Sequence, residues 1–480
     1  MSRHQWFTVA ALVLCGVTLV APRASAQIRD IQDRTLTAAD GTAFVVTSGV
    51  VRVPEERAGA HAGTRTIDLA IVRVRRGAAP SPTAHVVLAG GPGDSGVNLV
   101  LGMARQGGAA LSDLIAGDYI GIDQRGTGQS TPNLASTVLY GLPLEEAGSP
   151  VNWLPAMERV SKAVAAEFTA RGIRLQGYNT RESADDVEDV RRALGYDRMT
   201  LWGRSYGSHL ALAVLRRHPA AIDRLVLIGP EGPNDTWKLP SQVDAVLQRL
   251  EEKTGLPHLR ALMRDVIAQL ARTPAVVETT HPVTRQPVRV TIGAFDLQWI
   301  TAQALADPRA IATLPVAYRE MAAGDFRRIA PLVLLRRARL GVESAMKQMM
   351  DVSSGATAER LTRIEREATT ALLGNAINFP GMFLGRAWAA QDLGDDFRAP
   401  VTSNAPVLIL VGDLDPRTPI ENGREIARTL ANGRLVVVEN ASHQFDVFGS
   451  APIRTVLGQF LSGAAITAAP ITLPPLPFQK

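Results

Sequence analysis

Apolar residues form two patterns in the predicted strands of this chain: alternation with polar residues, and short continuous runs. Near its start, β-branched residues recur at strand spacing over residues 44–53 and 65–74, which predicts an antiparallel hairpin. Further on, short continuous apolar runs are typical of buried parallel strands, and several of them end in glycine-rich loops. These runs cover residues 85–89, 119–123, 199–202, 224–228, 407–411 and 435–438.

Stretches with helical composition or spacing alternate with these runs. The clearest covers residues 180–194: Thr180 or Ser183 can cap it, acidic residues fill its first turns, and Gly195 stops it. The other predicted helices cover residues 97–114, 210–217, 419–430 and 453–461.

The alternation stops between residues 234 and 399, where apolar residues keep helical spacing, prolines break the pattern, and one β-like run covers 288–292. This order predicts an α/β fold, a mostly parallel sheet flanked by helices, with a helical cap domain inserted over the strand ends. The predicted parts are a signal peptide (1–26), a first core part (27–233), the cap (234–399), a second core part (400–465) and a Pro-rich tail (466–480), either a surface strap or disordered.

Charge changes this picture little. The 480 residues include 51 basic and 46 acidic side chains, a net charge of +5, and the basic residues are almost all scattered arginines. No basic patch that would bind nucleic acid is visible.

The first residues predict export. A basic start, an apolar run and Ala24-Ser25-Ala26 form a signal-peptide pattern with cleavage after Ala26, and the apolar run is too short to remain as a membrane span. The only cysteine, Cys15, lies in that run. We therefore expect a periplasmic or extracellular protein without disulfides, a cysteine nucleophile or a metal site.

The chemistry centres on residues 203–207, Gly-Arg-Ser-Tyr-Gly, between a predicted strand and a predicted helix. In such a turn a serine takes strained backbone angles, the two glycines let strand and helix approach, and the hydroxyl is exposed at the end of the sheet. Ser205 is thus the candidate nucleophile. A serine hydroxyl needs a histidine to take its proton and a carboxylate to orient that histidine.

Both partners follow in the required order. Asp415 lies in the loop after the 407–411 strand, and His443 lies in the loop after the 435–438 strand. Asp413 is a rival acid, but the turn before Pro416 favours Asp415. We expect the other histidines to be structural.

An oxyanion intermediate needs two backbone N–H donors. Tyr206 supplies one at the start of its helix, and Gly91 is the candidate for the other, because Pro92 has no N–H and a glycine allows close approach.

Four ordered motifs carry a family resemblance. Together they resemble the proline iminopeptidase and tripeptidyl aminopeptidase branch of the α/β-hydrolases, over roughly residues 50–230 and 405–461. The motifs are Gly-Gly-Pro-Gly at 90–93, Asp-Gln-Arg-Gly-Thr-Gly-Gln-Ser at 123–130, Gly-Arg-Ser-Tyr-Gly at 203–207 and Gly-x-x-Asp-Pro-x-Thr-Pro at 412–419.

The resemblance implies Ser205, Asp415 and His443 as a catalytic triad, a cap that contributes to the pocket, and release of residues from peptide N-termini without a cofactor. It also suggests a structural loop in which Asp123 and Arg125 are paired. Two features depart from the family: Ala89 stands where iminopeptidases usually have histidine, and the cysteines common in secreted relatives are absent here.

An aminopeptidase needs carboxylates for the substrate's ammonium group, since a desolvated cation without a partner is costly. The candidates are Glu231, Asp235, Glu343 and Asp351. The leading hypothesis is thus an exported serine hydrolase acting on short peptides from the N-terminus. The alternatives are a carboxylesterase on the same triad, which needs no ammonium anchor, and an inactive binding protein of the same fold.

Overall fold

The computed structural model describes residues 27–77, 79–281, 284–467 and 469–479. The predicted signal peptide lies outside the described residues. Within the described ranges, no helix combines the length and apolarity needed to cross a membrane, and no three His, Cys, Asp or Glu side chains gather as metal ligands would.

One sheet of ten strands organises the larger part of the molecule, in the order β1-β2-β3-β5-β4-β6-β7-β10-β11-β12. Strands β1 to β3 are antiparallel, β5 joins β3 antiparallel, and all pairs from β5 to β12 are parallel. The strands are β1 Ile28–Thr37, β2 Ala43–Pro54, β3 Thr66–Arg75, β4 Ala84–Leu88, β5 Asp118–Ile122, β6 Met199–Ser205, β7 Ile222–Pro230, β10 Val407–Gly412, β11 Gly433–Glu439 and β12 Ile471–Thr472.

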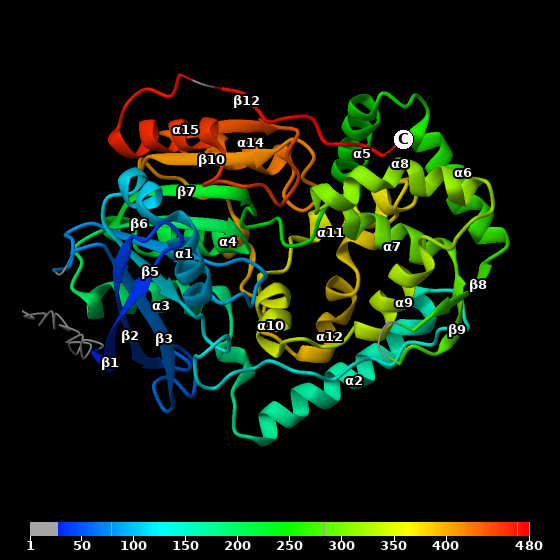
Figure 1. Ribbon diagram of the computed structural model, residues 1–480. Coiled ribbons are helices and arrows are strands. Elements are labelled where there is room, and N and C mark those ends of the chain that lie inside the picture. Colours follow the sequence, from blue (N-terminus) through cyan, green and yellow to red (C-terminus); the bar gives the residue numbers. More distant parts are fainter. Residues whose placement is uncertain (1–26, 78, 282–283, 468, 480) are drawn as a thin grey trace, which may run out of the picture.

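Helices cover both faces of this sheet (Figure 1). On one face, α1 and α15 bury apolar side chains against Trp202, Val226 and Leu408 of the sheet. On the other face, α3, α4 and α14 share a second apolar core with the intervening positions of the same strands. These helices are α1 Gly96–Leu114, α3 Thr180–Leu194, α4 Tyr206–Arg217, α14 Ile420–Arg428 and α15 Ala451–Ser462. The predicted fold class is confirmed.

The segment between β7 and β10 is helical and lies beside the carboxyl ends of the parallel strands, on the right in Figure 1. Its predicted β-like run is β9, which pairs with β8, a strand that the sequence pattern did not predict. The elements are α5 Pro240–Thr254, α6 Leu259–Arg272, β8 Ala275–Thr280, β9 Pro287–Ile292, α7 Ala294–Ala304, α8 Pro308–Ala322, α9 Ala330–Arg339, α10 Ala345–Ser354, α11 Ala358–Ala368, α12 Gly385–Trp388 and α13 Asp395–Arg398.

A helix from the first half of the chain joins this cap. Helix α2 (Pro150–Ala170) contacts α12, and its Trp153 packs against Phe295, Trp299 and Phe379 with ring centroids 5.9 to 6.2 Å apart. The cap core is therefore built from segments far apart in sequence.

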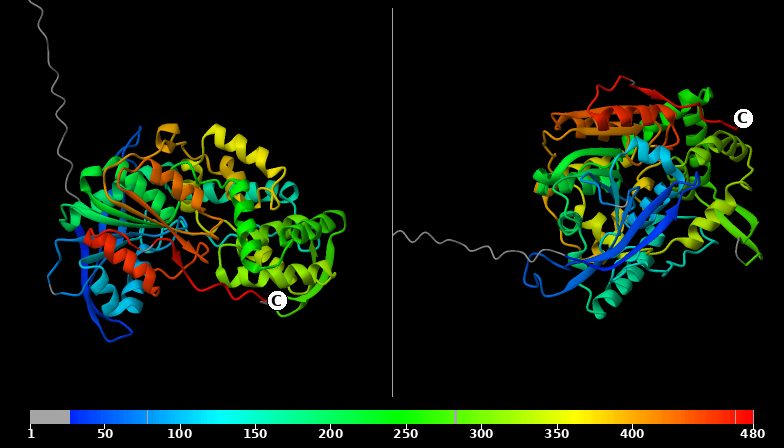
Figure 2. Two further views of the ribbon diagram at one scale, coloured as in Figure 1. Left: turned by 90° about the horizontal axis from the view of Figure 1, so that it is seen from above. Right: turned by 60° about the vertical axis from the view of Figure 1, so that its left-hand side comes forward.

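The Pro-rich tail is a strap across the surface. Strand β12 pairs with β11, and the Gln479 N–H then donates to the Ala312 carbonyl of α8 at 2.8 Å. Both views of Figure 2 show the tail leaving the sheet for the cap.

Two local expectations were wrong. Asn179, rather than Thr180 or Ser183, caps α3, because its side chain accepts the Glu182 N–H at 3.0 Å. Asp123 and Arg125 are not paired with each other.

Asp123 and Arg125 instead serve separate networks. Asp123 accepts hydrogen bonds from Ser95 and from two backbone N–H groups, whereas Arg125 forms a two-pronged ion pair with Asp186 at 2.7 and 2.8 Å. The loop is structural, as the resemblance suggested, but its partners come from distant elements.

Candidate active site

The turn at Ser205 joins β6 directly to α4. Ser205 has a φ of 53°, an uncommon value for a residue with a side chain. A Cβ atom on Gly207 would lie 2.0 Å from the carbonyl oxygen of Leu88, and one on Gly203 would lie 2.6 Å from the carbonyl oxygen of Gly207. Both glycines are therefore needed for strand and helix to meet around Ser205.

The loops after β10 and β11 bring the predicted acid and base together. The Nδ1 atom of His443 lies 2.8 Å from Asp415 Oδ2, and the Thr418 hydroxyl donates to the same oxygen at 2.7 Å. The backbone N–H groups of Arg417 and Thr418 donate to Asp415 Oδ1 at 2.8 and 2.9 Å. Burial alone would raise the pKa of Asp415, but His443 and these hydrogen bonds outweigh it and lower the pKa.

A glycine on β7 makes room for this pair. A Cβ atom on Gly229 would lie 3.2 Å from Asp415 Oδ2 and 3.4 Å from His443 Cε1. The rival acid, Asp413, forms an ion pair with Lys253 at 2.8 Å and is not among the hydrogen-bond partners of His443.

Ser205 and His443 line one cavity of about 930 Å³, together with residues of the cap. No hydrogen bond joins the Ser205 hydroxyl to the His443 ring among the residues that the structure describes. Such contacts are often long before substrate binds and shorten in the complex.

The predicted oxyanion donors lie beside Ser205. Tyr206 is the first residue of α4, so its N–H has no partner in the helical ladder. Gly91 lines the cavity with a φ of 108°, and a Cβ atom on its neighbour Gly90 would lie 3.3 Å from Ser205 Cβ. The loop after β4 thus packs directly against the nucleophile turn, with Ala89 buried behind it.

Among the predicted substrate carboxylates, Asp351 and Glu231 line the cavity and have carboxylate oxygens without a hydrogen-bond partner in the described residues. Asp351 of α10 forms no ion pair or side-chain hydrogen bond within the described residues. Burial, and then the charge of Glu231, raise the pKa of Asp351 to about 7. Glu231 accepts a hydrogen bond from Lys238 at 2.5 Å, while its Oε1 atom is buried without a partner.

The other two carboxylates differ. Glu343 lies at the exposed rim of the cavity and pairs with Lys347 at 3.3 Å. Asp235 is outside the cavity lining, and its carboxylate is bound by Arg360 at 3.0 Å. We therefore assign Asp235 a structural role.

Three residues of the site were not singled out from the sequence. Thr418, whose hydroxyl bonds to Asp415, was visible only as part of the 412–419 motif. Arg336 of α9 and Arg417 line the cavity, and no spacing pattern in the sequence indicated that they converge.

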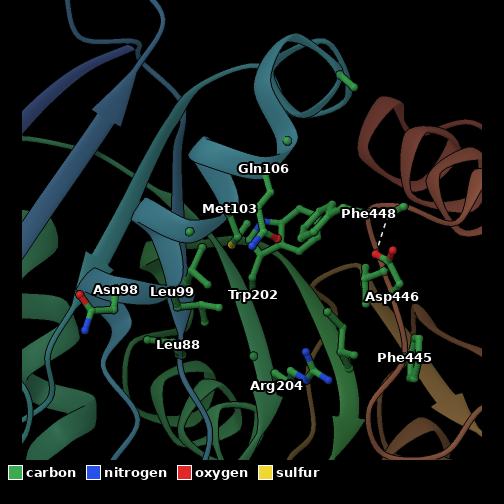
Figure 3. A pocket seen from close by; sticks show the side chains of 18 residues that line it. Leu88, Asn98, Leu99, Met103, Gln106, Trp202, Arg204, Phe445, Asp446 and Phe448 are labelled. Atoms are coloured by element: carbon green, nitrogen blue, oxygen red, sulfur yellow. Dashed lines mark hydrogen bonds between the residues drawn. The ribbon is translucent and has the colours of Figure 1, made fainter. Parts of the chain in front are cut away.

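A second cavity, of about 550 Å³, lies behind the nucleophile strand (Figure 3). It shares Asn98, Leu99 and Arg204 with the first cavity. Most of its wall is apolar, and it is bounded by the loop that follows His443. Its labelled apolar side chains are Leu88, Leu99, Met103, Trp202, Phe445 and Phe448.

The sequence matches the family described as alpha/beta hydrolase fold over residues 86–445, a stretch that includes Ser205, Asp415 and His443. The chain belongs to this family.

Two curated relatives of this hydrolase are peptidases by name. It is 26% identical over 193 residues to a tripeptidyl aminopeptidase of Streptomyces lividans, covering 39% of this chain and 35% of the relative. It is 26% identical over 155 residues to the serine protease Hip1 of Mycobacterium tuberculosis, covering 31% of this chain and 29% of the relative. The alignments thus span about a third of the relatives' length.

Two solved structures that match this chain are a peptidase and an esterase by name. The proline iminopeptidase of Mycobacterium smegmatis is 18% identical, with a TM-score of 0.37, covering 90% of this chain and 98% of that one. An esterase from Exiguobacterium antarcticum is 15% identical, with a TM-score of 0.35 and the same coverage.

Proposed function

We propose that this chain is an exported serine hydrolase that releases residues from the N-terminus of short peptides. The observation that carries the proposal is the contact between Asp415 and His443 beside the cavity that holds Ser205 at the end of β6. The two peptidase relatives support the same reaction class.

In the proposed reaction, Ser205 Oγ attacks the carbonyl carbon of the scissile bond while His443 Nε2 takes its proton. Asp415 orients the ring and stabilises its positive charge. The N–H groups of Gly91 and Tyr206 hold the oxyanion. His443 then protonates the leaving amine, and water hydrolyses the acyl-serine ester by the reverse proton transfers.

Recognition of a free amine is assigned to Asp351, assisted by Glu231. Asp351 forms no ion pair within the described residues, so a substrate ammonium would give this buried carboxylate a direct partner. Glu343 is too exposed to hold a desolvated cation strongly.

The nucleophile is tested by labelling with a fluorophosphonate. We expect the wild-type protein to be labelled and Ser205→Ala to be unlabelled, with peptide hydrolysis reduced by about four orders of magnitude or more. An unlabelled wild-type protein would support an inactive binding protein.

The amine requirement is tested with aminoacyl amides and their N-acetylated forms. We expect kcat/KM to favour the free amine by about 10- to 100-fold, because an ion-pair hydrogen bond contributes about 1.5–3 kcal/mol. Asp351→Asn is expected to remove most of this preference, whereas Glu365→Gln, an exposed acid on α11, is expected to retain it. Equal turnover of both substrates by the wild-type enzyme would favour a carboxylesterase.

A further inference from the structure

Two arginines of the cavity wall have no acidic partner. Neither Arg336 nor Arg417 forms an ion pair within the part of the chain that the structure describes. Arg336 lies over the ring of Trp299, with 5.2 Å from its guanidinium carbon to the ring centroid. Arg417 donates a hydrogen bond to the neutral side chain of Gln303.

A neighbouring arginine on the same helix has an acidic partner. The next residue of α9, Arg337, is fully buried and donates to both carboxylate oxygens of Asp296, at 2.5 and 2.9 Å. Arg336, one position earlier on the same helix, has no such ion pair within the described residues.

The two guanidinium groups also influence each other. Burial, and then the charge of Arg336, lower the pKa of Arg417. Like charges held together at a half-buried site raise the free energy of that site, and a bound anion relieves this repulsion. The acids whose charges act on these arginines each have another partner: Glu343 pairs with Lys347, Asp415 with His443, and Glu231 with Lys238.

The arginines lie on the histidine side of the cavity. Arg417 follows the acid Asp415 by two residues, in the same loop. Its partner Gln303 is one turn before Ala306, whose carbonyl accepts hydrogen bonds from the Ser442 hydroxyl and the Gln444 N–H. Ser442 and Gln444 flank His443.

The carboxylates lie on the nucleophile side. The Glu231 N–H donates to Ser208 Oγ in α4 at 2.8 Å, and Glu231 lies 3.9 Å from His209 of the same helix. Asp351 belongs to α10, whose Ser354 hydroxyl lies 3.1 Å from His209 Nε2. Glu231 and Asp351 are thus connected to the nucleophile helix, whereas Arg417 is connected to the histidine loop.

We propose that Arg336 and Arg417 form a subsite for a carboxylate on the leaving portion of the peptide. This rests on the proposed function, in which His443 protonates the amine that leaves. The carboxylate is either the free C-terminus of a short peptide or an acidic side chain after the scissile bond. Guanidinium groups match either source, because their planar donors pair with two oxygens.

Binding to the Ser205→Ala protein tests the subsite without turnover. Calorimetric titration with trialanine and with trialanine amide compares a free C-terminus with a neutral one. We expect trialanine to bind about 10- to 100-fold more tightly, as is typical of charge-assisted hydrogen bonds. Ala-Ala-Asp amide against Ala-Ala-Asn amide tests the side-chain source in the same way.

Variants of Arg336 test whether the preference for a free C-terminus depends on this residue. Adding Arg336→Gln to Ser205→Ala is expected to reduce the preference for trialanine to less than about threefold, and Arg336→Lys is expected to retain part of it. Arg339→Gln, an exposed arginine of the same helix, is the matched control and is expected to leave the preference unchanged. Equal or unmeasurable binding of trialanine and its amide, or an undiminished preference in Arg336→Gln, would overturn the subsite.

An N-acetylated trialanine separates this proposal from the proposed function. If acetylation leaves binding unchanged while the free C-terminus is still preferred, the carboxylate subsite stands and the amine anchor fails. If acetylation abolishes binding and the amide binds as well as the acid, the amine anchor stands and the subsite fails.

Discussion

At the scale of one residue, Asp351 illustrates how a buried carboxyl group lowers stability. Its pKa of about 7 in the folded protein is above the value of 3.8 that is ordinary for aspartate. Between these two values the folded state binds more protons than the unfolded state, so the contribution of Asp351 to stability falls as pH rises from about 4 to 7.

We therefore expect Asp351→Asn to increase the free energy of unfolding at pH 8. The full pKa difference corresponds to about 4 kcal/mol, and because the carboxyl faces a cavity that water can enter, we expect a gain of about 1–3 kcal/mol. Urea unfolding at pH 8 and pH 4 measures it. The gain should disappear at pH 4, where aspartate is protonated in the folded protein, and an equal gain at both pH values would refute this explanation.

Single residues also show how far sequence reasoning reaches. The placement of Ser205, Asp415 and His443 at one edge of the sheet was predictable, because strand order alone determines which loops meet there. The partner of Arg125 was not predictable, because Asp186 lies 61 residues away in the sequence and its position depends on how α3 packs. The convergence of Arg336 with Arg417 depends on the cap in the same way.

At the scale of elements, the contact between β4 and the start of α4 is tight enough to test. Gly207→Ala would place a Cβ atom 2.0 Å from the backbone oxygen of Leu88, so strand and helix would have to separate. We expect a loss of about 2–4 kcal/mol in stability, measured by urea unfolding.

Gly102 provides the matched control. It lies in α1, and a Cβ atom there would meet nothing within 4 Å. Gly102→Ala is therefore expected to stabilise the protein by about 0.5–1 kcal/mol, since alanine favours a helix more than glycine does. If Gly207→Ala and Gly102→Ala changed the free energy of unfolding by similar amounts, the close contact between residue 207 and Leu88 would not explain why glycine is needed there.

Strand β1 and helix α2 were not predicted from the sequence, and each has a physical reason. Strand β1 is exposed at nearly every position, so it has no apolar face that alternates with polar residues. Helix α2 does bury Trp153, Met157, Val164 and Phe168, but Trp153 packs against the cap, whose position the sequence does not reveal. Continuous apolar runs, by contrast, predicted every parallel strand from β4 to β11.

At the scale of the whole molecule, the tail links the sheet to the cap. Ile471 is 2% exposed in β12, and Leu476 and Phe478 pack against the larger apolar core. Removing residues 470–479 is expected to lower the free energy of unfolding by about 2 kcal/mol, after the entropy regained by the tail offsets part of the lost burial.

The same truncation is expected to raise KM more than it lowers kcat, because the cap supplies Arg336 and Asp351 while the sheet supplies Ser205. Thermal unfolding and peptide kinetics on the shortened chain measure both effects. Gln479→Ala is the control, since the bond to Ala312 uses the backbone N–H of residue 479. A shortened chain with unchanged melting temperature and KM would mean that the strap does not hold the cap.

Because the tail crosses from the sheet to the cap, one end of the described chain lies on the sheet and the other lies on the cap. Ile28 begins the strand at one edge of the sheet, and Gln479 is anchored on a cap helix. Since the sequence has one cysteine, Cys15, within the expected leader, thiols introduced at these two positions would accept a pair of fluorescent dyes without competition. Energy transfer between the dyes would then show whether the cap moves relative to the sheet during turnover.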